Sequence, residues 1–109
     1  MFKIIDEPKF TIPVTIKVPV DGGHKDETLT ATFKVLKTET LAGFNMTTEQ
    51  GTRDMLDAAV DRLDDLADGD GKPLEFNDEV KAAVLSLPYA RAGLANAYYA
   101  AVTKVARGN

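Results

Sequence analysis

Residues 66–79 hold the side chains of this sequence that are best suited to chemistry. Five carboxylates fall within these fourteen positions, on a stretch punctuated by two glycines and a proline: Asp68, Asp70, Glu75, Asp78 and Glu79. Carboxylate oxygens at this density could bind a divalent cation or act as an acid–base pair. The same residue types could instead build a tight corner between two helices, because glycine, proline and aspartate favour turns.

The spacing of the carboxylates argues against a calcium loop. An EF-hand loop needs oxygen ligands at positions 1, 3 and 5, glycine at position 6 and glutamate at position 12. A loop that starts at Asp64 has Leu66 at position 3, and one that starts at Asp68 has Lys72 at position 5 and Pro73 at position 6. Neither frame supplies the ligands, so we predict no metal and no other cofactor.

The residues needed for nucleophilic catalysis are scarce. The chain has one serine, Ser86, one histidine, His24, and no cysteine. Nothing in the pattern brings Ser86 and His24 together, as a nucleophile and its base require. Residues 69–71, Gly-Asp-Gly, lack the Lys-Ser/Thr pair of a phosphate-binding loop. We therefore predict that the protein is not an enzyme and that the acidic stretch is a corner.

Two runs of alternating side chains predict a β-hairpin near the N-terminus. Residues 10–20 and 29–35 place apolar side chains at every second position, which is the period of a half-buried strand. The polar, glycine-bearing residues 21–27 are predicted as the loop between them. Pro13 and Pro19 are an even number of positions apart, so both should lie on one edge of the sheet, where proline discourages unwanted strand pairing.

A long helix is predicted after the hairpin, preceded by a short one over residues 38–45. The long helix begins at a capping box with Thr47 as the N-cap and runs for about twenty residues to Gly69. Its aspartates lie opposite an apolar stripe, and that stripe consists of Leu56, Ala59, Val60, Leu63, Leu66 and Ala67.

Two further helices follow the acidic corner. Asn77 is the predicted N-cap of the first, and its apolar positions at helical spacing are Val80, Ala83, Val84 and Leu87. The last helix is predicted over about residues 88–106, with Pro88 at its first position. Leu74 and Phe76 are expected to anchor the corner between the two long helices.

These elements predict an α+β fold, in which an N-terminal antiparallel β-hairpin packs against three to four C-terminal helices. The length of 109 residues predicts a single domain, residues 1–109, with the hairpin at about 9–36 and the helical part at about 38–107. No signal peptide or membrane span is visible. The net charge of −4 and the lack of a basic stripe argue against nucleic-acid binding. We expect a soluble cytosolic protein that contacts neither membrane nor nucleic acid.

The last helix is apolar or aromatic around most of its circumference. Such a helix is either surrounded by its own domain or buried against another chain, and the small size of the domain favours the second. Tyr98 and Tyr99 diverge by about 100° on a helix, so one of them should belong to an interface together with Leu94 or Val102. The candidate interface residues are Arg91, Leu94, Tyr98, Tyr99, Val102 and Val105.

The order of these features resembles the tail assembly chaperones of long-tailed bacteriophages and prophages. The likeness rests on residues 68–77, Asp-Gly-Asp-Gly-Lys-Pro-Leu-Glu-Phe-Asn, followed by Pro88 and the pair Tyr98-Tyr99. The preceding hairpin fits too, so the resemblance covers nearly the whole chain. One departure is Leu63, where many such sequences carry a tryptophan before the acidic turn.

The resemblance implies a non-enzymatic protein that keeps the long, helical, aggregation-prone tape measure protein soluble while the tail tube polymerises around it. It also implies self-association, and a longer frameshifted product whose extension recruits the tail tube protein. The expected location is the host bacterial cytoplasm and not the mature virion. The alternative function is a small structural component of the virion, such as a tail-completion protein.

Overall fold

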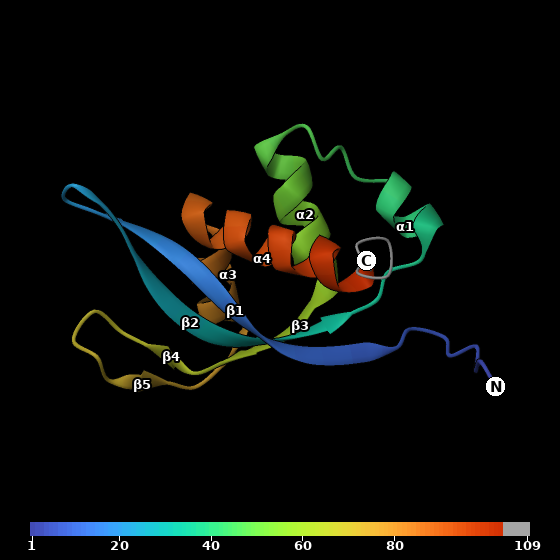
Figure 1. Ribbon diagram of the computed structural model, residues 1–109, viewed down its shortest axis with the longest axis horizontal. Helices are drawn as coiled ribbons and strands as arrows, with labels where there is room; N and C mark the ends of the chain where they lie inside the picture. The colour runs from blue at the N-terminus through green and yellow to red at the C-terminus, as the bar shows by residue number, and fades with distance from the viewer. Residues whose placement is uncertain (104–109) are drawn as a thin grey trace.

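The computed structural model describes residues 1–103 and shows an antiparallel sheet covered by helices (Figure 1). The elements in chain order are β1 (Lys9–Val20), β2 (Gly23–Lys34), α1 (Thr38–Ala42), α2 (Glu49–Ala59), β3 (Val60–Asp64), β4 (Leu66–Ala67), β5 (Pro73–Leu74), α3 (Asp78–Leu85) and α4 (Pro88–Val102). The main sheet has the order β1-β2-β3, and β4 and β5 form a separate pair. Helices α2 and α4 lie over one face of the main sheet. This arrangement confirms the predicted α+β class, with an N-terminal hairpin followed by helices.

The hairpin of β1 and β2 is longer and its turn is shorter than predicted. The strands pair from Lys9 opposite Lys34 to Val20 opposite Gly23, so only two residues form the turn. Gly22, with φ of +81°, provides the left-handed conformation that this tight turn requires. The predicted loop over residues 21–27 is therefore wrong, because most of it continues the ladder of β2.

The predicted alternation along β1 is confirmed. Val14 and Ile16 are buried, whereas Thr15 and Lys17 between them are exposed. Only at the turn does the pattern fail, since Val20 is 44% exposed. The apolar face of the hairpin is thus covered along part of its length and open near its tip.

Both prolines lie in an edge strand, as predicted. Strand β1 pairs only with β2, with Pro13 opposite Thr30 and Pro19 opposite His24. In a hairpin with a two-residue turn, the residues that flank the turn form a hydrogen-bonded pair. Even-numbered residues of β1 therefore bond to β2, and the two prolines face the open edge, where their missing N–H groups cost nothing.

The predicted helix from Thr47 to Gly69 is wrong in its second half. Helix α2 ends at Ala59, and the chain continues as β3, which pairs with β2. The ammonium group of Lys81 donates to the carbonyl oxygens of Asp57 and Val60, both at 2.9 Å, and so satisfies acceptors where the helix ends. The N-cap is also one residue later than predicted, since the Thr48 side chain accepts a hydrogen bond from the Gly51 N–H.

The spacing of Val60 and Leu63 explains this error. Residues three apart share a face of a helix but point to opposite faces of a regular strand. In β3, Thr32 pairs with Arg62 and Phe33 pairs with Val60, which leaves Asp61 as an extra residue. This bulge places Val60 and Leu63 on one face, where both are buried. The free edge of β2 thus outweighs the local helical pattern.

The acidic stretch forms a short β-hairpin and not a helix end. One carboxylate oxygen of Asp68 accepts from the N–H groups of Asp70, at 2.9 Å, and Lys72, at 3.0 Å. Gly71, with φ of +82°, turns the chain between β4 and β5. The Arg62 guanidinium lies 5.7 Å from the ring centre of Phe76 and holds the end of the corner.

The two helices after the corner begin as predicted. The Asn77 side chain accepts from the Val80 N–H at 2.8 Å, and Pro88 lies in the first turn of α4. Leu87 was expected in the apolar stripe but is 38% exposed, because α3 ends at Leu85, which is the buried residue of that helix. The predicted end of α4 at about residue 106 lies outside the described residues.

One hydrophobic core joins the sheet to the helices. Its largest fully buried side chains are Tyr98, Phe33, Met55, Leu56, Leu63, Leu85, Leu94, Val14 and Val60. Helices α2, α3 and α4 each contribute at least one buried residue to this core, whereas α1 contributes none. Within residues 1–103, no helix is long and apolar enough to cross a membrane.

Candidate protein-interaction surfaces

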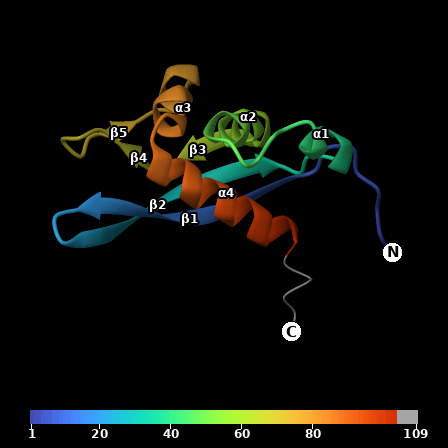
Figure 2. The ribbon, with the colours of Figure 1, turned by 90° about the horizontal axis from the view of Figure 1, so that it is seen from above.

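Helix α4 crosses β1 at close range (Figure 2). At Gly93, an added Cβ would lie 2.7 Å from the Ile16 side chain and 3.2 Å from the Thr15 carbonyl oxygen. The absence of a side chain at Gly93 therefore lets the helix approach the strand. As a consequence, Leu94 and Tyr98 are fully buried. Both were predicted interface residues, and for both the prediction is wrong, because the sheet, α2 and α3 together surround this side of the helix.

Tyr98 is the centre of an aromatic cluster. Its ring lies 5.2 Å from that of Phe33 and 6.2 Å from that of Phe10, measured between ring centres. Its hydroxyl oxygen accepts a hydrogen bond from the Leu36 N–H at 2.8 Å. Burial raises the pKa of the Tyr98 hydroxyl above its ordinary value. The ring thus fastens α4 to both strands and to the segment that follows β2.

Tyr99 and Val102 lie on the side of α4 that is half-buried. The Tyr99 ring packs edge-on against Tyr98, with ring centres 5.8 Å apart and an angle of 74° between the planes. The two tyrosines therefore diverge as predicted, with one in the core and the other partly accessible. Tyr99 and Val102 stay candidates for an interface, and Val105 lies outside the described residues.

Arg91 has a structural role and is not a free residue at the edge of an interface. Its side chain is only 12% exposed, and its guanidinium donates to the Leu85 carbonyl oxygen at 2.8 Å and to the Glu49 carboxylate at 2.5 Å. Arg91 thereby connects α4 with the end of α3 and the start of α2. The prediction of Arg91 as an interface residue is not supported, because its side chain is largely buried and its charge is already paired.

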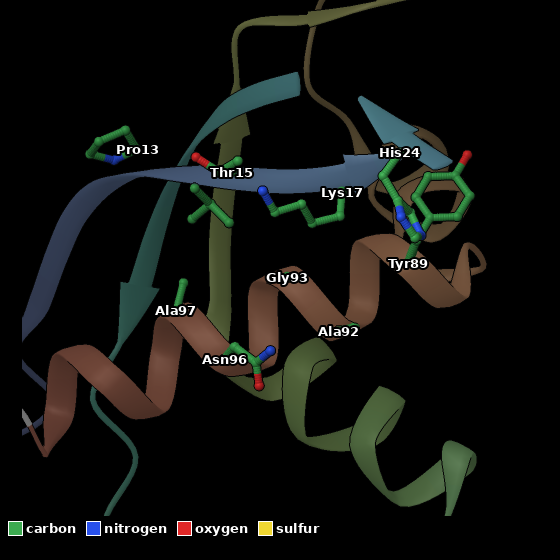
Figure 3. Close-up of a pocket in the computed structure, with 10 residues that line it drawn as sticks. Pro13, Thr15, Lys17, His24, Tyr89, Ala92, Gly93, Asn96 and Ala97 are labelled. Carbon is green, nitrogen blue, oxygen red and sulfur yellow. The ribbon is translucent and has the colours of Figure 1, made fainter. Parts of the chain in front are cut away.

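A groove of about 530 Å³ lies between β1 and α4 (Figure 3). On the strand side it is lined by Pro13, Thr15 and Lys17, with His24 from β2. On the helix side it is lined mainly by small residues around Gly93, and Tyr89 closes one end. The polar groups in this groove are few and well separated along the two elements. The groove could therefore accommodate side chains of another molecule, but it does not form a reactive centre.

A second groove, of about 460 Å³, lies under the outer half of the hairpin. Its apolar lining comes from β1, β2, β4 and the junction of α3 and α4, and includes Val18, Leu66, Val84, Leu87 and Tyr89. Three carboxylates also line it, Glu27, Asp65 and Asp68, and no lysine, arginine or histidine does. We call this feature the acidic groove.

The residues before β1 form an exposed apolar arm. Phe2 is 91% exposed, Ile4 is 93% exposed and Ile5 is 61% exposed. We call residues 1–5 the N-terminal arm. Because large exposed apolar surfaces are often used for binding, the arm is a candidate interaction surface. The sequence analysis missed the arm, although apolar residues that precede the strand and fall outside its alternation were a usable signal.

The fold is therefore that of a small α+β module with two surface grooves and an exposed apolar arm. Within residues 1–103, no group of three or more side chains could hold a metal ion.

The chain belongs to a family described as phage tail assembly chaperone, whose profile matches residues 1–109. This match confirms the resemblance found in the sequence. No curated protein and no solved structure matches the chain.

Proposed function

We propose that this phage tail assembly chaperone binds the tape measure protein and keeps it soluble while the tail tube is assembled. The proposal rests on the family of the chain together with one structural observation, the accessible apolar surface. Two grooves and the half-buried Tyr99 and Val102 offer places for apolar side chains of another polypeptide. A long helical protein whose apolar stripes lack partners would be shielded by such surfaces.

The action that we propose is binding without covalent change of the partner. Several copies are needed to cover a long partner, so we further propose that the protein self-associates. A longer frameshifted product would recruit the tail tube protein through its extension. The protein would act in the host bacterial cytoplasm and would be absent from the mature virion, as a non-enzymatic assembly factor.

Co-expression with the tape measure protein of the same phage tests the proposal. The expected result is that the tape measure protein moves from the insoluble to the soluble fraction and co-purifies with the chain. Tyr99→Ser, at a half-buried site on α4, should weaken this effect. Glu39→Ser, at an exposed position of α1 that lines neither groove, is the control and should leave the effect unchanged. An insoluble tape measure protein in the presence of abundant folded chaperone would contradict the proposal.

A structural role in the virion is the second candidate. Mass spectrometry of purified particles separates the two functions, because a virion component is present in stoichiometric amounts and an assembly chaperone is absent. We expect absence.

A further inference from the structure

The N-terminal arm leaves the domain at a fixed point and has no cover of its own. The Val35 N–H donates to the Pro8 carbonyl oxygen at 2.8 Å, and the Lys37 ammonium pairs with the Asp6 carboxylate at 2.6 Å. Beyond this anchor, Phe2 and Ile4 are more than nine-tenths exposed. The arm also carries one cationic side chain, Lys3, and no carboxylate. It is therefore an apolar, positively charged segment without a partner in its own chain.

The acidic groove has the complementary properties. Ile16, Leu29 and Ala90 form its buried apolar floor, and Leu87 at its margin is 38% exposed. The lining carboxylates give the margin a negative charge. Glu27 is paired with Lys25 at 3.1 Å, but no ion pair with a described residue is formed by Asp65 or Asp68.

We propose that the N-terminal arm of one copy binds in the acidic groove of a second copy. Phe2, Ile4 and Ile5 would cover the apolar floor, and Lys3 would lie against the carboxylates at the margin. This inference names the surfaces for the self-association proposed above and rests on that part of the proposed function. Burying a large apolar side chain fully is favourable, and charge complementarity selects the orientation and the partner.

An arm cannot reach the groove of its own chain. With Asp6 held beside Lys37, Phe2 can extend at most about 14 Å from the anchor. Ile16, a floor residue of the groove, lies seven residues along β1 from Lys9, a distance of about 23 Å in a strand. Figure 1 shows the N-terminus at one end of the molecule, and the hairpin turn, β4 and α3 toward the other. The molecule measures 47 Å along its longest axis.

The groove between β1 and α4 is a poorer partner for the arm. Its basic lining residues are His24 and Lys17, which is paired with Asp26 at 2.8 Å, and the lining has no carboxylate. A lysine-bearing segment would find no carboxylate in the lining to pair with, so this groove lacks the charge complementarity of the acidic groove. The charge of the lining therefore distinguishes two grooves of similar volume.

Each copy has one arm and one groove, so two copies can exchange arms reciprocally in a symmetric dimer, or the contact can repeat from head to tail. Two variants disable one surface each at exposed positions. The arm variant carries Phe2→Ser and Ile4→Ser, and the groove variant carries Glu27→Arg and Leu87→Arg. Val20→Ser is the matched control, because Val20 is an exposed apolar residue that does not line the acidic groove. Thermal melting establishes that all variants are folded.

Sedimentation velocity over a range of concentrations measures association. We expect at least a tenfold loss of apparent association constant in the arm variant and in the groove variant, and no change in the control. A mixture of the two variants should form a heterodimer and nothing larger, because one copy keeps an intact arm and the other an intact groove.

The outcomes separate this inference from the proposed function. Unchanged association of the arm or groove variant, or no heterodimer in the mixture, would overturn the arm-to-groove contact while self-association stands. A wild-type chain that is monomeric throughout would overturn both the contact and self-association. Tape measure solubility, measured separately in co-expression, reports on the chaperone function in each case.

Discussion

Helix α4 and the N-terminal arm are both rich in apolar residues, and the structure treats them in opposite ways. Ala90, Leu94 and Tyr98 of α4 are buried in the core, whereas Phe2 and Ile4 of the arm are more than nine-tenths exposed. Composition therefore does not decide which apolar segment is buried within its own chain and which stays exposed. What decides is whether other elements of the same chain can reach the segment and cover it.

The two segments differ in their neighbours. Helix α4 lies where β1, α2 and α3 converge, and Gly93 removes the side chain that would hold it away from β1. The arm lies beyond the start of β1. The residues that join it to the strand are held by the ion pair of the Asp6 carboxylate with Lys37 and by the hydrogen bond from the Val35 N–H to the Pro8 carbonyl oxygen. Helix α4 is thus covered by elements of its own chain, whereas the arm is not.

The largest expected effect tests the core side of this comparison. Tyr98→Ala should lower the free energy of unfolding by about 3–5 kcal/mol, because it empties the centre of the aromatic cluster and leaves a cavity. Tyr99→Ala on the half-buried side is the control, and should cost clearly less. Urea unfolding followed by circular dichroism measures both. Equal losses would mean that the two sides of α4 are covered to the same extent.

A second prediction concerns β3, the strand found where the sequence predicted the second half of a long helix. Leu63→Ala should cost about 2–5 kcal/mol, since Leu63 is fully buried in the shared core. The exposed neighbour Arg62→Ala is the control, although loss of its contact with Phe76 gives it a small cost of its own. A loss below about 0.5 kcal/mol for Leu63→Ala would place this residue at the surface.

The sequence predicted the elements whose signals are local. The alternation of β1, the N-cap Asn77, the first-turn position of Pro88, and the edge position of Pro13 and Pro19 were all predicted from short stretches of sequence, and all are confirmed. The end of α2 was missed, because the apolar spacing of Val60 and Leu63 suits a helix as well as a bulged strand. Only the free edge of β2, a long-range feature, distinguishes the two.

The candidate site was predicted less well than the fold. Of the candidate interface residues, Tyr99 and Val102 lie on the half-buried side of α4. Leu94 and Tyr98 belong to the core, and Arg91 is held by Glu49 and Leu85. The size argument assumed that so small a domain could not surround a helix. Strand β1 and helices α2 and α3 nevertheless pack against α4 and bury Ala90, Leu94 and Tyr98.

A smaller effect is expected from the hydroxyl group of Tyr98. Tyr98→Phe keeps the ring but leaves the Leu36 N–H without its acceptor, so we expect a loss of about 0.5–1.5 kcal/mol near neutral pH. The loss should be well below that of Tyr98→Ala. A Phe variant as unstable as the Ala variant would show that the hydrogen bond, and not ring packing, dominates at this site.

The wild-type protein and Tyr98→Phe should also differ in how their stability changes in alkaline solution. Because burial raises the pKa of Tyr98 in the folded chain, the hydroxyl is protonated in both states below the unfolded pKa of about 10, and stability is unaffected there. Above that value the unfolded chain loses the proton first, and stability falls as pH rises toward the folded pKa. Tyr98→Phe should remove this part of the alkaline loss, which unfolding at about pH 8 and about pH 11 would measure.

The smallest expected effect tests the arm. Phe2→Ser should change the free energy of unfolding by less than about 0.5 kcal/mol at concentrations where the chain is monomeric, because an exposed side chain contributes little to its own fold. Phe10→Ser is the matched comparison, since Phe10 lies in the aromatic cluster with Phe33 and Tyr98 and should cost several times more. If Phe2→Ser destabilises the monomer as much as Phe10→Ser does, the arm packs on its own domain. The contrast between α4 and the arm would then disappear, because both segments would be covered by the chain to which they belong.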